Sequence, residues 1–378
     1  MKNIFWIGAA AVLLGIITIF SISGPKPASG EPIKIGISTM LSGDYAALGD
    51  NIVKTAELAV AEVNVKGGIN GRPLELVVQD AGLDSKTGLA AAQKLINVDG
   101  VKYIIGGTSS NGTLAAAPLA NEHKVIYMTP VTGGANVDSA GEYIFRVANG
   151  DLLAGKQLAE AAVKLGYKNV AVVAEVTEYT LDIKKSFEEA IKDQGAVVVA
   201  SEEFQPGTTD FRTIIAKVKT QNPEAILIVS QTGVGGANFV KQSREAGIEA
   251  PLFSDFNFVA NTSAKEIVGS FEGIYFADPA YGADAGETKA FFERYEIAYG
   301  SQPFIPFHSA STYDSVMMVA DALKAVGDDS IKVHDWLLGE VQNRKGLMGT
   351  FSIDQQGNSD LGFVIKVIRD GKPEVVFN

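Results

Sequence analysis

Tyr103-Ile-Ile-Gly-Gly-Thr-Ser-Ser-Asn-Gly-Thr-Leu-Ala-Ala-Ala-Pro118 is the stretch that decides the fold of this chain. A short apolar run ends there at two glycines, and a group of hydroxyl residues precedes an alanine-rich segment. This pattern predicts a strand, a loop and the start of a helix. In a parallel α/β sheet such a junction lies at the carboxyl end of the strand. Free N–H groups and the positive end of the helix dipole attract an anion there.

Two strand ends in this region carry similar polar groups. Ser109 and Ser110 offer hydroxyls that can donate to a carboxylate, although Ser110 or Asn111 could instead do no more than cap the helix. The next apolar run continues as Val125-Ile-Tyr-Met-Thr-Pro-Val-Thr-Gly-Gly-Ala135 and again ends at hydroxyls and glycines. Because neighbouring parallel strands end at the same edge of a sheet, both sets of groups would face one crevice.

Composition limits the classes of protein that the chain can form. It has 378 residues, of which 46% are hydrophobic, so it can build two cores of ordinary size. The formal net charge of −12 argues against binding to nucleic acid or to anionic lipid. There is no cysteine, which excludes disulfides, thiolate metal sites, a cysteine nucleophile and a lipid-modified cysteine.

The N-terminus resembles an export segment. Residues 1–23 hold one lysine followed by an uncharged apolar run from Ile4 to Ser23, which predicts a signal peptide or a membrane anchor. The run exceeds the usual signal core of about 7–15 residues and is just long enough to cross a bilayer. Residues 24–32 form a Pro/Gly/Ser-rich linker. We expect the body to lie in the periplasm or outside the cell, tethered to the membrane if the segment is kept.

From Ile33 onward, strand-like and helix-like segments alternate. The pattern predicts an α/β fold of two doubly wound, Rossmann-like lobes. We expect lobe 1 to comprise residues 33–148 plus 278–349, and lobe 2 residues 149–277 plus 350–378. The chain would then cross between the lobes near Asn149, Ala277 and Gly349. Several short crossings form a hinge, and a hinge between two lobes creates a cleft in which a ligand can be enclosed.

The sequence lacks catalytic and cofactor motifs. Gly233-Val-Gly-Gly-Ala-Asn238 has an asparagine where a dinucleotide fingerprint needs its third glycine. Neither a nucleophile elbow nor a P-loop occurs, and His123, His308 and His334 show no metal-ligand spacing. We therefore expect no enzyme activity, no cofactor and no metal.

The second lobe offers its own candidate binding residues after strand ends. Tyr179 follows the first strand of that lobe, Thr232 follows a later one, and Asp255 and Phe256 follow another. The Tyr179 ring could cover a ligand, or it could be an ordinary core or surface tyrosine. Asp255 could pair with an ammonium group, or it could cap a helix or lie in a turn.

Several motifs occur in a characteristic order: Ile33-Lys-Ile-Gly36 with Leu41-Ser-Gly43, Val65-Lys-Gly-Gly-Ile-Asn-Gly-Arg-Pro-Leu-Glu-Leu76, Ala90-Ala-Ala-Gln-Lys-Leu-Ile96 and Ile104-Ile-Gly-Gly107. With them the chain resembles the type I periplasmic solute-binding proteins of ABC transporters, in the leucine/isoleucine/valine-binding branch. The resemblance extends roughly from Ile33 to the C-terminus.

The resemblance implies roles for individual residues. Ser110, with Ser109 beside it, matches the serine that holds the ligand carboxylate, and Tyr179 matches the tyrosine that closes over the ligand. The other matched positions depart from the family pattern. The family's threonine aligns with Gly133, and the acidic residue with which family members bind the ligand's ammonium group aligns with Phe256. Two positions that are aromatic in the family align with Leu48 and with a place near Thr232. Thr132, beside Val131, would then replace the threonine, and Asp255 lies one place before the acidic position.

The resemblance also implies a function. We expect a monomer that captures a small organic solute, a branched-chain or other amino acid, and delivers it to an ABC transporter permease in the membrane. Two alternatives remain open from the sequence. The chain could be the extracellular sensor component of a signalling receptor, or its ligand could be a carboxylate that is not an amino acid.

Overall fold

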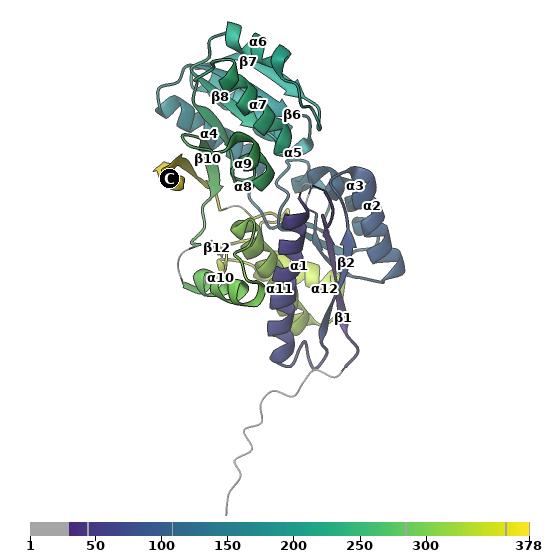
Figure 1. The fold of residues 1–378 in the computed structure, drawn as a ribbon. Coiled ribbons are helices and arrows are strands. Elements are labelled where there is room, and N and C mark those ends of the chain that lie inside the picture. Colours follow the sequence, from purple (N-terminus) through teal and green to yellow (C-terminus); the bar gives the residue numbers. More distant parts are fainter. Residues whose placement is uncertain (1–29, 44, 108, 284–285, 360, 378) are drawn as a thin grey trace, which may run out of the picture.

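The computed structural model describes residues 30–43, 45–107, 109–283, 286–359 and 361–377. The predicted signal peptide or anchor, residues 1–23, lies outside the described residues, as does most of the 24–32 linker. None of the helices within the described ranges is long and apolar enough to cross a membrane. Figure 1 shows two α/β lobes joined by thin connecting segments, as the alternating sequence pattern predicted.

The sheet of lobe 1 has five parallel strands in the order β2-β1-β3-β4-β5. Parallel neighbours arise because a helix or a long loop separates consecutive strands and returns the chain to the same edge. The carboxyl ends of all five strands therefore point the same way. The strands are β1 (Ile33–Thr39), β2 (Leu74–Asp80), β3 (Tyr103–Gly106), β4 (Ile126–Thr129) and β5 (Ile144–Arg146).

Helices cover both faces of this sheet. Apolar residues at helical spacing, Ile52, Ala56 and Ala59, bury one side of α1 (Ala46–Val65) in the core of the first face. That face also receives α10 (Gly286–Tyr299), α11 (Pro306–Val326) and α12 (Ser330–Glu340). The opposite face is covered by α2 (Ser85–Gln93), the π-turn η1 (Lys94–Val98) and α3 (Ser110–Glu122), with the 3-10 turn η2 (Val137–Ser139) at the edge.

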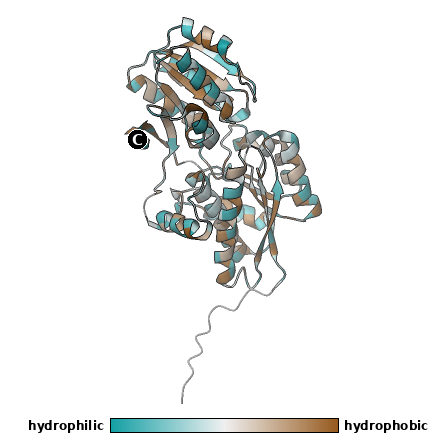
Figure 2. Cartoon of the chain, in the orientation of Figure 1, coloured by the Kyte–Doolittle hydropathy of each residue, from teal (hydrophilic) through white to brown (hydrophobic). Residues whose placement is uncertain are grey.

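Lobe 2 repeats this architecture with a seven-stranded sheet in the order β14-β13-β10-β9-β8-β6-β7. Its members are β6 (Asn169–Glu175), β7 (Val197–Phe204), β8 (Ala225–Val229), β9 (Leu252–Asp255), β10 (Tyr275–Pro279), β13 (Phe363–Arg369) and β14 (Lys372–Phe377). The last two are antiparallel additions. The helices are α4 (Asp151–Lys164), α5 (Glu178–Asp193), α6 (Arg212–Thr220), α7 (Val234–Glu245), α8 (Phe256–Ala260) and α9 (Thr262–Val268). In Figure 2 the brown, hydrophobic segments concentrate in the sheets and the teal ones on the outer helices.

Two of the lobe boundaries expected from the sequence need correction. β10 continues to Pro279 and pairs with β13, so the second crossing lies after Pro279 rather than at Ala277. The third crossing lies well beyond Gly349, because the hairpin of β11 (Arg344–Gly346) and β12 (Gly349–Phe351) and the following Ile353 belong to lobe 1. The chain enters lobe 2 only at Phe363.

Hydrogen bonds tie the first crossing to the third. Asn149 Nδ2 donates to the carbonyl of Gly362 at 2.6 Å, and its Oδ1 accepts from the amide of Leu361 at 2.9 Å. Just before it, Arg146 Nη1 donates to the carbonyl of Ser359 at 2.8 Å. These bonds join segments more than 200 residues apart in the chain, so they hold the first and third crossings of the hinge against each other.

A buried carboxylate fixes the end of lobe 1. Asp314 on α11 accepts the amides of Leu347 and Met348 at 2.9 and 2.8 Å, and burial raises its pKa to about 6. A Cβ added at Gly346 would lie 2.5 Å from both oxygens of Asp314, closer than real atoms approach.

Gly346→Ala should therefore displace the Asp314 carboxylate and lower the free energy of unfolding by about 1–3 kcal/mol, measured by denaturant titration. The matched control is Gly339→Ala in α12, where no heavy atom lies within 4 Å of the added Cβ. We expect that control to be neutral or stabilising by about 0.5–1 kcal/mol. Equal effects of the two substitutions would contradict the role assigned to Asp314.

Candidate ligand-binding site

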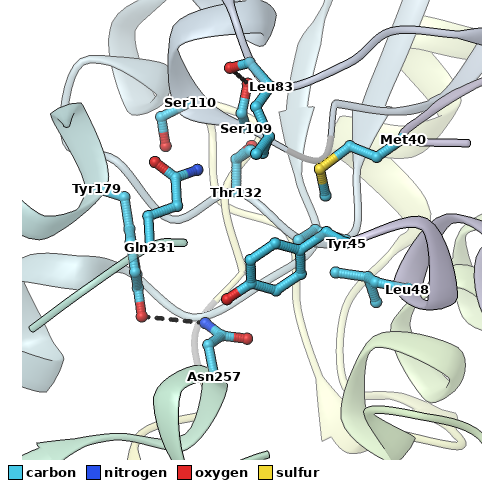
Figure 3. Close-up of a pocket in the computed structure, with 11 residues that line it drawn as sticks. Met40, Tyr45, Leu48, Leu83, Ser109, Ser110, Thr132, Tyr179, Gln231 and Asn257 are labelled. Carbon is cyan, nitrogen blue, oxygen red and sulfur yellow. Dashed lines mark hydrogen bonds between the residues drawn. The ribbon is translucent and has the colours of Figure 1, made fainter. Parts of the chain in front are cut away.

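A pocket of about 390 Å³ opens between the lobes, where loops after β1, β3, β4 and β8 meet the start of α5 and α8. We call it the outer pocket. Its polar groups lie on the side of Ser110, Gln231 and Tyr179, and Met40, Tyr45 and Leu48 lie opposite (Figure 3). Its lining consists of Met40, Tyr45, Leu48, Leu83, Ser109, Ser110, Val131, Thr132, Tyr179, Gln231 and Asn257.

The two adjacent serines have different roles. Ser109 caps α3: its hydroxyl accepts from the amide of Gly112 at 3.0 Å and donates to the carbonyl of Leu83 at 2.8 Å. Ser110, the first residue of the helix, makes no side-chain hydrogen bond to any described residue. Its hydroxyl lies in the outer pocket, and a Cβ at Gly134 would come within 2.9 Å of it. A free hydroxyl at a helix N-terminus is a donor suited to an anion.

The loop after β4 approaches the same place. Val131 and Thr132 line the outer pocket, and the Thr132 hydroxyl is hydrogen-bonded to that of Thr129. Gly133, expected at the site, lines neither cavity. Its carbonyl accepts from the amide of Asp151 at 2.7 Å, and a Cβ there would lie 2.3 Å from the Asn149 carbonyl oxygen. Gly133 therefore lets the first crossing pack against this loop.

Tyr179 reaches the site from the first turn of α5. Its hydroxyl donates to Asp255 Oδ1 at 2.5 Å and accepts from Asn257 Nδ2 at 3.0 Å. Burial, and then the neighbouring Asp255 carboxylate, raise the pKa of Tyr179 well above its usual value, so the phenol stays protonated. Asp255 also caps α8 through the amides of Asn257 and Phe258. The residue fulfils its expected capping alternative and still presents a second oxygen, Oδ2, without a partner among the described residues.

Thr232 does not line the outer pocket. Its amide and hydroxyl both donate to the buried carboxylate of Glu175, each at 2.9 Å, and Ser230 adds a third bond at 2.9 Å. These three bonds hold the β8–α7 loop, and the residue between the two donors, Gln231, enters the pocket instead. The sequence pattern therefore identified the loop, but the side chain of this loop that lines the outer pocket is Gln231 rather than Thr232.

The opposite wall is largely apolar. Met40, Leu48 and Leu83 come from loops and from α1 of lobe 1, with the Tyr45 ring beside them (Figure 3). Leu48 was expected from the sequence, but Tyr45 was not. Tyr45 lies three residues earlier, immediately before α1, a spacing that places both side chains on one face of the helix start. This spacing from Leu48 is the feature of the sequence from which Tyr45 could have been predicted.

A second cavity of about 340 Å³ adjoins the outer pocket and shares Val131, Tyr179 and Asn257 with it. We call it the inner chamber. Phe256 lines this chamber, with its ring 5.4 Å from that of His308. Its lining consists of Val131, Ala148, Asn149, Asp151, Ala154, Tyr179, Ile183, Asp255, Phe256, Asn257, Phe307, His308 and Phe363.

His308, which sequence reasoning left without a role, reaches the inner chamber from α11. Its Nε2 lies 3.1 Å from Asn257 Oδ1, which links lobe 1 to lobe 2. Burial lowers the pKa of His308 to about 4, opposed by the nearby Pro130 carbonyl, so the ring is neutral near pH 7. Within the described residues, no group of three or more His, Cys, Asp or Glu side chains could hold a metal ion.

Comparison with known proteins identifies the family. The family model described as periplasmic binding protein matches residues 32–365. A Leu/Ile/Val-binding protein of Escherichia coli (strain K12) is 30% identical over 272 residues, which cover 71% of this chain and 72% of that protein. The chain therefore belongs to the type I periplasmic binding proteins, in the branched-chain amino acid group.

Solved structures agree on the fold. The branched-chain amino acid transporter substrate binding protein LivJ from Streptococcus pneumoniae, in complex with isoleucine, superposes with a TM-score of 0.82 at 28% identity. The match covers 92% of this chain and all of that one. A solute binding protein of an ABC transporter from R. palustris, in complex with 4-hydroxybenzoate, gives 0.83 at 23% identity over 92% and 96% of the chains, which shows the fold alone. The predicted family and two-lobed fold are confirmed.

The structure makes Thr232 a support for the β8–α7 loop, and a pair of substitutions can test this. Thr232→Val removes one donor from the buried Glu175 carboxylate and should lower the free energy of unfolding by about 1–3 kcal/mol. Thr232→Ser keeps the hydroxyl and should remain near wild type. Denaturant unfolding measures both. A large loss of solute affinity in Thr232→Val, with unchanged unfolding, would instead place Thr232 in contact with the ligand.

Proposed function

We propose that this protein captures a small apolar amino acid in the outer pocket and presents the closed, loaded form to an ABC transporter permease. The observation that carries the proposal is the free hydroxyl of Ser110 at the N-terminus of α3. The family consists of solute-binding proteins, and the S. pneumoniae relative was solved with isoleucine bound.

The carboxylate of the ligand would bind at α3. Ser109 satisfies the amide of Gly112, and its carbonyl accepts from the amide of Thr113. The amides of Ser110 and Asn111 are the remaining donors of the first turn, since the first N–H groups of a helix have no partner within it. Together with the Ser110 hydroxyl and the dipole of a 13-residue helix, they form a site complementary to one negative charge.

The side chain of the ligand would face the apolar wall. Met40, Leu48 and Leu83 can bury an aliphatic group, and each buried methylene contributes about 0.8 kcal/mol. Micromolar capture requires about −8 kcal/mol. Charge-assisted hydrogen bonds of about 1.5–3 kcal/mol each and this burial both contribute to that value, and the cost of ordering the ligand opposes them.

Capture by closure would use contacts that already join the lobes. The amide of Ala135 in lobe 1 donates to Asp182 Oδ2 of α5 at 2.7 Å, and Asn136 is hydrogen-bonded to Glu178. His308 and Asn257 add the link at the inner chamber. A ligand that contacts both Ser110 and Tyr179 would favour the closed arrangement, because only that arrangement lets it reach both lobes.

Ser110→Ala should weaken solute binding about 10- to 100-fold, because one hydrogen bond to a charged group is lost. Isothermal titration calorimetry with leucine, isoleucine and valine measures the effect, and the free energy of unfolding without ligand should stay near wild type.

Ser109→Ala is the matched control. Because Ser109 caps α3, its loss should cost about 0.5–2 kcal/mol of stability. If Ser110→Ala binds every tested solute as tightly as wild type, the carboxylate site is not at α3 and the proposal fails.

A further inference from the structure

The short helix α8 lies on the side of lobe 2 that faces lobe 1 (Figure 1). Phe256, its first residue, is half-buried and packs against the core of lobe 1 as well as against the cores on both faces of the lobe 2 sheet. Ala260, four residues later, also packs against the core of lobe 1. Residues four apart lie on one face of a helix, so one face of α8 contacts the opposite lobe.

Lobe 2 holds α8 in place. The side chain of Asp255 caps the helix by accepting from the amides of Asn257 and Phe258. The Phe258 ring is fully buried in lobe 2, with its centroid 5.1 Å from that of Phe271. A Cβ added at Gly236 on α7 would lie 2.8 Å from the Phe258 ring, so α7 packs closely against it. We therefore expect α8 to move with lobe 2.

On the lobe 1 side, the first turn of α11 meets α8. The centroid of the Phe256 ring lies 6.2 Å from that of Phe307, with the two rings at 90°. It lies 5.4 Å from the centroid of the His308 ring. Phe307 and His308 are 2% and 1% exposed, so the packing of lobe 1 fixes both rings. Edge-to-face ring pairs at these separations stabilise a contact beyond the area that they bury.

A directed chain of hydrogen bonds runs beside these rings. Asp255 Oδ1 already accepts the amides of Asn257 and Phe258, so the Tyr179 hydroxyl donates to it. That hydroxyl accepts from Asn257 Nδ2, which turns Asn257 Oδ1 toward His308 Nε2 at 3.1 Å. An amide oxygen can only accept, so His308 carries its proton on Nε2 and donates it. The chain begins in lobe 1 and ends on a carboxyl group of lobe 2.

We propose that α8 and the first turn of α11 form a latch that holds the two lobes together before a solute binds. The latch consists of Phe256 and Asn257 from lobe 2 and Phe307 and His308 from lobe 1. Its contacts join side chains of the chain itself, and opening the hinge would separate α8 from α11 and break them. The latch therefore contributes to closure on its own, and the solute-free protein populates the closed arrangement alongside the open one.

A latch affects affinity differently from a residue that touches the solute. When a solute binds the closed arrangement, its apparent affinity is proportional to the fraction of the protein that is closed. Because the latch acts on the protein alone, weakening it lowers the affinity for every solute by the same factor. A residue in contact with the solute would change the affinities unequally, according to the shape of each solute.

The first test measures the distance between the lobes in the solute-free protein. The chain has no cysteine, so Lys289→Cys on α10 and Asp193→Cys on α5, both at exposed positions, place one spin label in each lobe. Double electron–electron resonance on the full chain, refolded to remove bound solute, then reports the open and closed populations. Phe256→Ala should lower the ratio of closed to open protein about three- to tenfold. An entirely open wild type would overturn the proposal.

Phe304→Ala is the matched control. Phe304 is a half-buried phenylalanine of lobe 1 that packs against the core of its own lobe. The same truncation there should lower stability and leave the ratio of closed to open protein unchanged. An equal effect of the two truncations on that ratio would contradict the latch. These measurements need no solute, so their failure would leave the proposed function intact.

The second test is calorimetric titration with each amino acid that binds the wild type. Phe256→Ala should weaken all of them by one common factor, equal to the fall in the closed fraction. Unequal losses would place Phe256 in contact with the solute and contradict the latch. If no amino acid binds the wild type, the proposed function fails, and the distance measurement still decides for or against the latch.

The third test concerns the hydrogen bond of the latch. His308→Leu removes the donor to Asn257 and should lower the ratio of closed to open protein about two- to tenfold. His308→Gln keeps an N–H donor on a side chain of similar length and should retain most of the wild-type ratio. If glutamine and leucine at this position behave alike, the hydrogen bond between His308 and Asn257 is not part of the latch.

Discussion

The hydrogen bonds of Asn149 to Leu361 and Gly362 are the constraint on which the site depends. They hold the first and third crossings together, and the crossings set where the two sheets face each other. Each sheet by itself only presents a row of strand ends. Because the crossings are fixed, the strand ends of lobe 1 and lobe 2 meet, and two cavities form where neither lobe could enclose one alone.

Two neighbouring serines of the outer pocket differ in role: Ser109 caps a helix, and Ser110 does not. A helix N-terminus needs a cap, and one hydroxyl can satisfy it. Ser109 fulfils this need in α3, which leaves Ser110 without a structural obligation. The same division occurs in lobe 2, where Thr232 bonds Glu175 and leaves Gln231 in the pocket. In both loops the residue that is hydrogen-bonded internally lies beside a residue whose side chain lines the outer pocket.

The inner chamber buries two carboxyl groups, and their burial lowers the stability of the fold. Asp151 and Asp255 are buried, and one oxygen of each has no hydrogen-bond partner among the described residues, an arrangement that costs free energy. The hydrogen bonds from Tyr179 and from the start of α8 relieve part of that cost at Asp255.

The sequence by itself determined the α/β alternation, the two lobes and the loops that carry the site. Apolar periodicity reports which face of a local element is buried, and the residues after each apolar run must lie at a strand end. That logic placed Ser109, Ser110, Val131, Thr132, Tyr179 and Leu48 in loops or helix starts that now line the outer pocket. The glycines and hydroxyls after β3 and β4 led to the prediction of an anion site there.

Only the tertiary structure decided which side chain of each loop lines a cavity and which distant residues join it. The way the helices pack across the hinge brings further residues into the cavities: Tyr45, Gln231, Asn257, Asp151 and His308. Apolar periodicity does not predict how helices pack against one another. The third crossing was expected too early, at Gly349, because Phe351 and Ile353 pack against lobe 1 after a short hairpin that resembles any other strand pair. Local pattern fixes the elements, whereas contacts between elements far apart in the chain fix the site.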